Sequence, residues 1–173
     1  METRPSSDDS YVHFGLGAGG TADSLEVAWP SGHVQTLGEV PEGRFFRVRE
    51  SQMTCSPVDD PDLDGFCTAE DNCTAKWNPD QIDTDLDGYG NACDADWDNS
   101  GTVGGNDWLI YSAAYESTPN DPNWNPVVDT NDDLIIGGAD YLLFSAQWGQ
   151  SPGPSGLACA DPTGATAPCV ANP

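Results

Sequence analysis

The chain of 173 residues carries 29 acidic side chains against 5 basic ones, which gives a formal charge of −24. Nucleic acids and anionic membranes are bound by basic patches, so this charge argues against both kinds of partner. No stretch has the length and apolar character of a transmembrane helix, and the N-terminus lacks the apolar core of a signal peptide.

Residues 1–50 form the first predicted unit, a small β module. Apolar and polar residues alternate between glycine and proline turns, which predicts short strands at 11–17, 24–29, 33–37 and 44–50. The glycine-rich run 15–20 invites comparison with a dinucleotide-binding loop, but the helix that such a loop requires does not follow it. His13 and His33 belong to no nucleophile or metal motif.

The runs HFGLG (13–17) and WPSG (29–32) resemble the ASPIC/UnbV module over about residues 11–50. That resemblance implies a module that follows a β-propeller in secreted proteins. The usual upstream half of the module is absent, so we expect an incomplete sheet with open edges. Its apolar residues need cover, namely Leu25, Val27, Trp29, Val34, Leu37, Phe46 and Val48.

An aspartate-rich motif of twelve residues then occurs four times, as loop one (60–71), loop two (83–94), loop three (96–107) and loop four (129–140). Oxygen side chains stand at positions 1, 3, 5 and 12, and position 7 can add a backbone carbonyl, as in calcium-binding loops. Glycine at position 6 permits a sharp turn in the first three loops, whereas loop four has Leu134 there. The predicted ligands are Asp60, Asp62, Asp64, Phe66 and Asp71; Asp83, Asp85, Asp87, Tyr89 and Asp94; Asp96, Asp98, Ser100, Thr102 and Asp107; and Asp129, Asn131, Asp133, Ile135 and Asp140.

These loops predict a protein that binds about four or more calcium ions. The alternative is a solvated acidic linker, because acidic chains rich in glycine and proline are often disordered. Disorder would not preserve the twelve-residue spacing four times. Without metal, we expect much of the chain to lose its order.

From Asp60 to Asp94 the motifs DPDLDG, DNC, NPDQ and DTDLDGYGNACD closely resemble thrombospondin type 3 repeats. That resemblance implies a chain wound around calcium ions at 51–95, with little regular secondary structure and a Cys73–Cys93 disulfide. Cys55 would then pair with Cys67, and Cys159 with Cys169, although six cysteines allow fifteen connectivities. Thr74 departs from the family and creates a glycosylation sequon at Asn72.

Two runs repeat at an offset of 33 residues, DWLIYSAAY (107–115) after loop three and DYLLFSAQW (140–148) after loop four. They predict a duplicated loop–helix unit, with the position-12 aspartate near the start of each helix. The pair resembles a type I dockerin over 94–149, assigned here as a domain at 96–149. The resemblance implies pseudo-two-fold symmetry and binding to cohesins, although positions 10 and 11 are Gly105-Asn106 and Gly138-Ala139. The tail 150–173 is expected to be mobile unless it docks.

The predicted fold class is therefore multi-module: a small β piece, calcium-stapled irregular repeats and a pair of loop–helix units. No nucleophile–base pair, zinc motif or phosphate loop is present, so we expect a non-enzymatic, extracellular or cell-surface protein, expected to be bacterial, with a structural, adhesive or assembly role. We also expect a C-terminal part of a longer secreted chain, or a chain whose leader was removed. The alternative is a dockerin that tethers an upstream activity to a cohesin-bearing scaffold, and an appendage of an enzyme stays open. The expected partner is another copy, a cohesin-like domain or the upstream part of its own protein, and another copy could extend the open sheet into a fibre.

Overall fold

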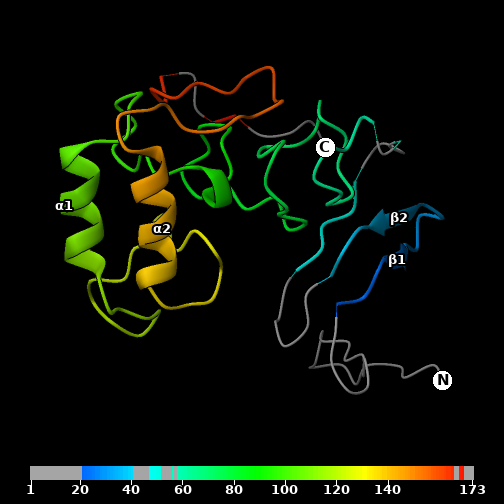
Figure 1. Ribbon diagram of the computed structural model, residues 1–173, viewed down its shortest axis with the longest axis horizontal. Helices are drawn as coiled ribbons and strands as arrows, with labels where there is room; N and C mark the ends of the chain where they lie inside the picture. The colour runs from blue at the N-terminus through cyan, green and yellow to red at the C-terminus, as the bar shows by residue number, and fades with distance from the viewer. Residues whose placement is uncertain (1–20, 41–46, 52–55, 57, 166–167, 170–173) are drawn as a thin grey trace.

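The computed structural model describes residues 21–40, 47–51, 56, 58–165 and 168–169. Regular secondary structure is sparse in this part of the chain, as expected. It consists of strands β1 (Leu25–Ala28) and β2 (Val34–Leu37), the short 3-10 helix η1 (Asn91–Cys93), and helices α1 (Gly105–Ala114) and α2 (Gly138–Gln147). The hairpin lies at one end of the molecule and the two helices at the other, with the irregular loops between them (Figure 1). No helix in the described part of the chain is both long and apolar enough to cross a bilayer.

The two strands pair antiparallel, with Leu25 opposite Leu37 and Ala28 opposite Val34. The inner face of the hairpin lies against loop one, because Gly38 N–H donates to Leu63 O (2.7 Å). Leu37 is fully buried there, whereas Val34 lies on the outer face and is 53% exposed. The need for cover predicted from the sequence is thus met within the chain for Leu37 but not for Val34.

Two of the other predicted strands have a different outcome. The strand at 11–17 lies outside the described residues. For 44–50 the prediction is wrong in its described part, since residues 47–50 are not a strand. Arg49 N–H donates to Pro79 O (2.7 Å) and Arg47 pairs with Asp132 (3.6 Å), so this segment follows the loops rather than a sheet.

Both predicted helices are present and begin two residues earlier than the sequence pattern indicated. Each position-12 aspartate is the third residue of its helix. Asp107 accepts a hydrogen bond from Gly104 N–H and Asp140 accepts one from Gly137 N–H, both at 2.7 Å. A carboxylate at this place satisfies a free N–H group and is favoured by the helix dipole.

The two loop–helix units exchange equivalent backbone hydrogen bonds. Position 8 of loop four, Ile136, donates to Ser117 O (3.0 Å) and accepts from Glu116 N–H (2.9 Å). Position 8 of loop three, Val103, pairs in the same way with residues 149 and 150 beyond the other helix, at 2.9 and 2.8 Å. These bonds join residues related by the 33-residue offset, so each unit is completed by the segment that follows the other helix.

A small aromatic core holds the helices together. Its buried members are Ala95, Trp97, Val103, Tyr111, Ala114, Val128, Ile136 and Phe144. Tyr111 and Phe144 stack with their ring centroids 6.5 Å apart, and Tyr111 Oη donates to Gly137 O (2.9 Å). The outer aromatic residues remain accessible, with Trp108 43% and Trp148 55% exposed. The helix aromatics thus divide between core and surface.

The tail docks along its described part. It runs back over the loops in the middle of the molecule (Figure 1). Gly153 N–H donates to Cys93 O (2.9 Å), and Pro154 O accepts from Thr74 N–H (3.0 Å). These contacts are made by backbone atoms, so the side-chain pattern of the tail does not predict them.

Candidate metal centres

All four aspartate loops have the same backbone course. Position 4 is left-handed in each loop, with φ between 52° and 63° at Leu63, Leu86, Asn99 and Asp132. Position 6 is left-handed too, with φ of 94°, 97°, 85° and 65° at Gly65, Gly88, Gly101 and Leu134. Glycine adopts this conformation without steric cost, which explains its presence in three of the loops. Two left-handed residues fold each loop back on itself and turn its oxygen atoms inward.

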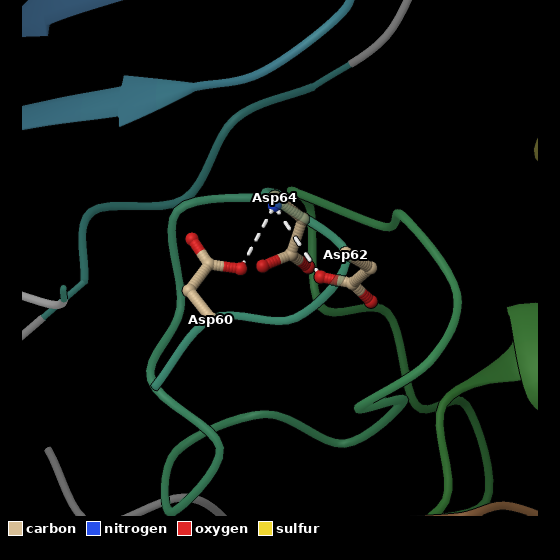
Figure 2. Close-up of side chains that lie close together, drawn as sticks. All are labelled: Asp60, Asp62 and Asp64. Carbon is tan, nitrogen blue, oxygen red and sulfur yellow. Dashed lines mark hydrogen bonds between the residues drawn. The ribbon is translucent and has the colours of Figure 1, made fainter. Parts of the chain in front are cut away.

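Loop one brings together the carboxylates of positions 1, 3 and 5. One oxygen from each of Asp60, Asp62 and Asp64 lies within 4.8 Å of the others. The backbone holds them from inside the loop, since Asp64 N–H donates to Asp60 Oδ1 (3.2 Å) and Asp62 Oδ1 (3.4 Å) (Figure 2). Three carboxylates on one small turn repel one another unless protons or a cation neutralise them.

Loops two and three form comparable groups. In loop two the group is Asp83, Asp85 and Asp87, and in loop three it is Asp96, Asp98 and Asp107. Loop three therefore includes its position-12 aspartate, carried on α1. Its position-5 residue joins the set through hydrogen bonds, because the Ser100 hydroxyl donates to Asp96 Oδ1 (3.3 Å) and Thr102 O (3.1 Å).

The position-12 aspartates of loops one and two are buried but lie outside these groups of three. Asp71 Oδ1 accepts from Cys73 N–H (2.8 Å), and Asp94 Oδ1 accepts from Asp96 N–H (2.7 Å). Both carboxylates still interact with the position-5 carboxylate of their own loop. Burial is the largest cause of the raised pKa of both Asp64 and Asp94, and the next largest is the charge of Asp71 for Asp64 and the charge of Asp87 for Asp94.

Loop four shares the turn but differs in its ligand set. Asp133 N–H donates to Asp129 Oδ1 and Asn131 Oδ1, both at 3.2 Å, as position 5 does in loop one. Position 3 is an asparagine, so the loop has one carboxylate fewer in its turn. Asp140 faces position 2, where it accepts from Thr130 N–H (2.8 Å). The carboxylates of this loop form no group of three within 4.8 Å among the described residues.

Several loop oxygens are buried with no hydrogen-bond partner. They are Asp62 Oδ2, Asp71 Oδ2, Asp87 Oδ2 and Asp96 Oδ2, all from predicted ligands. A buried carboxylate oxygen without a partner costs free energy, and a bound cation removes that cost. Oxygen-only ligands suit a hard cation such as Ca²⁺ or Mg²⁺, so the residues present fit the predicted ion.

The carboxyl pKa values show the same crowding. Burial, with help from the nearby Asp71 carboxylate, raises the pKa of Asp62 to about 7 and that of Asp64 to about 8. Burial and the adjacent Asp85 raise the pKa of Asp87 to about 7. In loop four, burial raises the pKa of Asp129 to about 6, with a smaller effect from Asp140. Such shifts mark charges that are held together at a cost.

Gln81 is a site residue that the sequence analysis did not single out. Its side chain is buried between loop one and the start of loop two, and its Nε2 donates to Asp64 Oδ2 and Asp71 Oδ1, both at 3.0 Å. Its Oε1 accepts from Asn72 N–H (2.9 Å). Gln81 therefore fixes the distance between positions 5 and 12. The NPDQ motif contained this residue, but only the structure shows which carboxylates it reaches.

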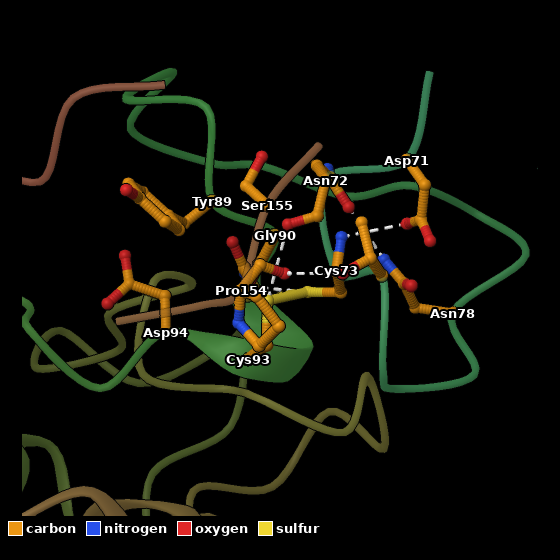
Figure 3. The surroundings of a disulfide bond; sticks show 12 residues. Asp71, Asn72, Cys73, Asn78, Tyr89, Gly90, Cys93, Asp94, Pro154 and Ser155 are labelled. Carbon is orange, nitrogen blue, oxygen red and sulfur yellow. Dashed lines mark hydrogen bonds between the residues drawn. A yellow bond between two sulfur atoms is a disulfide. The ribbon is translucent and has the colours of Figure 1, made fainter. Parts of the chain in front are cut away.

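Disulfides fasten the loops. Cys73 and Cys93 are bonded, with Cα atoms 5.7 Å apart, and the bridge lies beside Asn72, Gly90 and Pro154 (Figure 3). Cys159 and Cys169 are also bonded. These two predicted pairings are confirmed, whereas Cys55 of the third lies outside the described residues.

Asn72 of the predicted sequon is 3% exposed, and its Nδ2 donates to Gln81 O (3.0 Å). The folded chain therefore leaves no room for a glycan at this side chain.

Comparison with known proteins gives one family match, to the family described as ASPIC and UnbV, over residues 4–54. The match supports the resemblance drawn for the N-terminal module and covers less than a third of the chain. Neither the curated proteins nor the solved structures include a match to this chain. The N-terminal segment is thus similar to the ASPIC and UnbV family.

Proposed function

We propose that this chain is a calcium-binding, non-enzymatic part of an extracellular protein with a structural, adhesive or assembly role. The observation that carries the proposal is the shared turn of the four loops, with left-handed residues at positions 4 and 6 and oxygen side chains at positions 1, 3 and 5. The buried, unpartnered oxygens of Asp62, Asp87 and Asp96 support it from the side of energetics.

An extracellular setting is supported by the two described disulfides, which persist in oxidising surroundings. Sparse secondary structure around carboxylate loops also agrees with the proposed likeness of 51–95 to thrombospondin type 3 repeats. In such a chain the free energy of ion binding is largely free energy of folding. Calcium then acts as the core that this segment lacks.

Calcium titration followed by calorimetry and circular dichroism tests the proposal. We expect about four ions to bind, and we expect chelation to abolish ordered structure across 58–149. Magnesium, at matched concentration, is the control cation, because its strict octahedral geometry suits these loops less well. Unchanged circular dichroism and protease resistance in excess chelator would falsify the proposal.

The second candidate is a dockerin that attaches an upstream activity to a cohesin-bearing scaffold. It is favoured by the exchange of position-8 hydrogen bonds between the two loop–helix units and by the exposed Leu109 and Leu142, which are equivalent under the 33-residue offset. A pull-down against a panel of cohesins separates the candidates. Tight binding that requires calcium favours the dockerin, whereas self-assembly in calcium without any cohesin favours the structural role.

A further inference from the structure

The docked tail makes its densest contacts with a single turn of loop two. The carbonyl oxygens at positions 4, 5 and 6 of that loop each accept a hydrogen bond from the tail. The three donor–acceptor pairs are Cys169 N–H with Leu86 O (2.7 Å), Asp161 N–H with Asp87 O (2.9 Å), and the Ser155 hydroxyl with Gly88 O (2.6 Å). This turn carries the aspartate at position 5 and the left-handed glycine at position 6. The tail therefore binds the part of the loop that sets the ligand geometry.

Close packing reinforces these bonds. A Cβ atom on Gly88 would lie 2.6 Å from Ala160 Cα and 2.7 Å from Cys169 Sγ, so the tail fills the space beside the glycine. The Cys159–Cys169 disulfide encloses Asp161 and ends at Cys169, two of the three donor residues. A closed loop has fewer conformations when it is undocked, so docking costs it less entropy.

The same turn is braced differently in the other loops. In loop one the hairpin supplies the donors, with Gly38 N–H bonded to Leu63 O (2.7 Å) and Gln35 Nε2 to Gly65 O (3.3 Å). In loop three the Ser151 hydroxyl donates to Gly101 O (3.1 Å). Within the described residues, no donor reaches the carbonyls of positions 4 to 6 in loop four. Hydrogen bonding from segments outside the loops to this turn is therefore most extensive in loops one and two and weaker in loop three. Among the described residues it is absent in loop four.

We propose that the described parts of the C-terminal segment, 150–165 and 168–169, act as a clamp for the second calcium loop, in which Ser155, Asp161 and Cys169 are positioning residues that raise its calcium affinity. The inference rests on the proposed calcium binding. A loop whose turn is already held loses less conformational freedom when the ion arrives, so more of the ligand interaction remains as affinity. By reciprocity, calcium in loop two strengthens the docking of the tail.

The test is a calcium titration of the full chain by NMR, in which one backbone amide reports on loop two and another reports on loop four. The amides of Gly88 and Leu134 donate to the position-1 carboxylates of loops two and four, both at 3.0 Å, so their signals follow those two sites. The main variant replaces both Cys159 and Cys169 with serine. Ser155→Ala removes a single donor and keeps the disulfide, and Ser155→Thr restores the hydroxyl. Ser112→Ala is the matched control, because the Ser112 hydroxyl donates to Leu109 O (3.0 Å) in α1, far along the chain from loop two.

The calcium midpoint at Gly88 should rise about tenfold in the double cysteine variant and about threefold in Ser155→Ala, while Ser155→Thr and Ser112→Ala leave it unchanged. The midpoint at Leu134 should stay constant in all variants. An unchanged Gly88 midpoint in both variants overturns the clamp, and so does an equal shift at Gly88 and Leu134, which would mean general destabilisation. If the amide signals of Gly88 and Leu134 in the unaltered chain do not change when calcium is added, the proposed function itself fails.

Discussion

At the scale of single residues, Leu134 shows the clearest conflict between a residue type and its backbone conformation. It occupies position 6 of loop four with φ of 65°, where the other loops have glycine. A side chain in the left-handed region costs roughly 1–2 kcal/mol. Its side chain is 47% exposed, so burial recovers only part of that cost. We therefore expect Leu134→Gly to strengthen calcium binding by loop four, by about 0.5–1 kcal/mol after the entropy cost of glycine, as measured by calorimetry.

Gly101→Ala is the reciprocal control for that change. Its Cβ would meet Thr163 Cγ2 at 3.6 Å, an ordinary contact, so backbone strain alone acts there. The free energy of calcium binding by loop three should therefore weaken by roughly 1 kcal/mol, similar to the gain expected for loop four. Weaker binding in Leu134→Gly would show that the leucine packs usefully and that the strain argument is wrong.

The position-5 aspartates test the ligand assignment itself. Asp64→Ala and Asp87→Ala each remove a carboxylate from the centre of a loop, and loss even of an outer partner costs about 10–100-fold in metal affinity. We expect at least that loss in the altered loop, with local unfolding detected by limited proteolysis. Asp59→Ala is the matched control, since Asp59 is exposed and precedes loop one without being a ligand. Equal calcium affinity in Asp59→Ala and Asp64→Ala would contradict the assignment.

At the scale of elements, the two loop–helix units differ in how their helices end. The residue two places beyond each helix is left-handed, Glu116 with φ of 61° and Gly149 with φ of 76°. Glycine is the favoured residue at such a position because it has no Cβ. Glu116→Gly should therefore stabilise the calcium-loaded protein by about 0.5–1 kcal/mol, seen as a higher melting temperature. Gly149→Ala should lower it, and the expectation fails if both substitutions shift the melting temperature in the same direction.

The elements also show what a sequence can and cannot reveal. Spacing of aspartates and the 33-residue offset predicted the loops and helices, because their chemistry depends on side chains at fixed intervals. The brace that β2 supplies to loop one depends on Gln35, a polar residue in a short strand, whose Nε2 reaches a carbonyl 30 residues away in the chain. The tail bonds mostly through backbone N–H groups, which every residue except proline carries. Neither contact leaves a periodic signal.

At the scale of the whole molecule, we expect the crowded carboxylates to make stability depend on pH in opposite ways with and without the proposed calcium ions. In the calcium-free chain the pKa of Asp64 is raised to about 8 and that of Asp62 to about 7, above the ordinary value of 3.8. The folded state thus holds protons more tightly than the unfolded state, and the stability this provides is lost as pH rises through these values. Calcium binding needs the same groups deprotonated, so its contribution grows with pH.

Thermal melting at pH 5 and pH 8 separates the two cases. By circular dichroism, calcium-stripped protein should retain more ordered structure at pH 5 than at pH 8, and calcium should raise the melting temperature more at pH 8 than at pH 5. Asp64→Asn, which cannot titrate at that position, should flatten the calcium-free dependence. A calcium-stripped chain that is more stable at pH 8 contradicts the argument.

The hairpin offers a route to assembly. Trp29 N–H donates to His33 O (2.8 Å), and this bond sets the alternation of the ladder. Leu25 and Val27 are then the bonded positions of β1, so the N–H groups of Glu26 and Ala28 face away from β2. Among the described residues no strand other than β2 pairs with β1. A two-stranded hairpin is marginal alone, and an unpaired edge accepts a strand from another chain.

We therefore expect the calcium-loaded chain to associate through the outer edge of β1. Four bound ions would leave a formal charge of about −16, so repulsion opposes association and added salt should promote it. Sedimentation at increasing concentration in calcium should show a growing sedimentation coefficient at high salt. Ala28→Pro removes an outward N–H without touching the bonds to β2 and should keep the chain monomeric, whereas Ala28→Thr, which keeps the N–H, should not. A compact monomer at every concentration and salt level would exclude assembly through this edge.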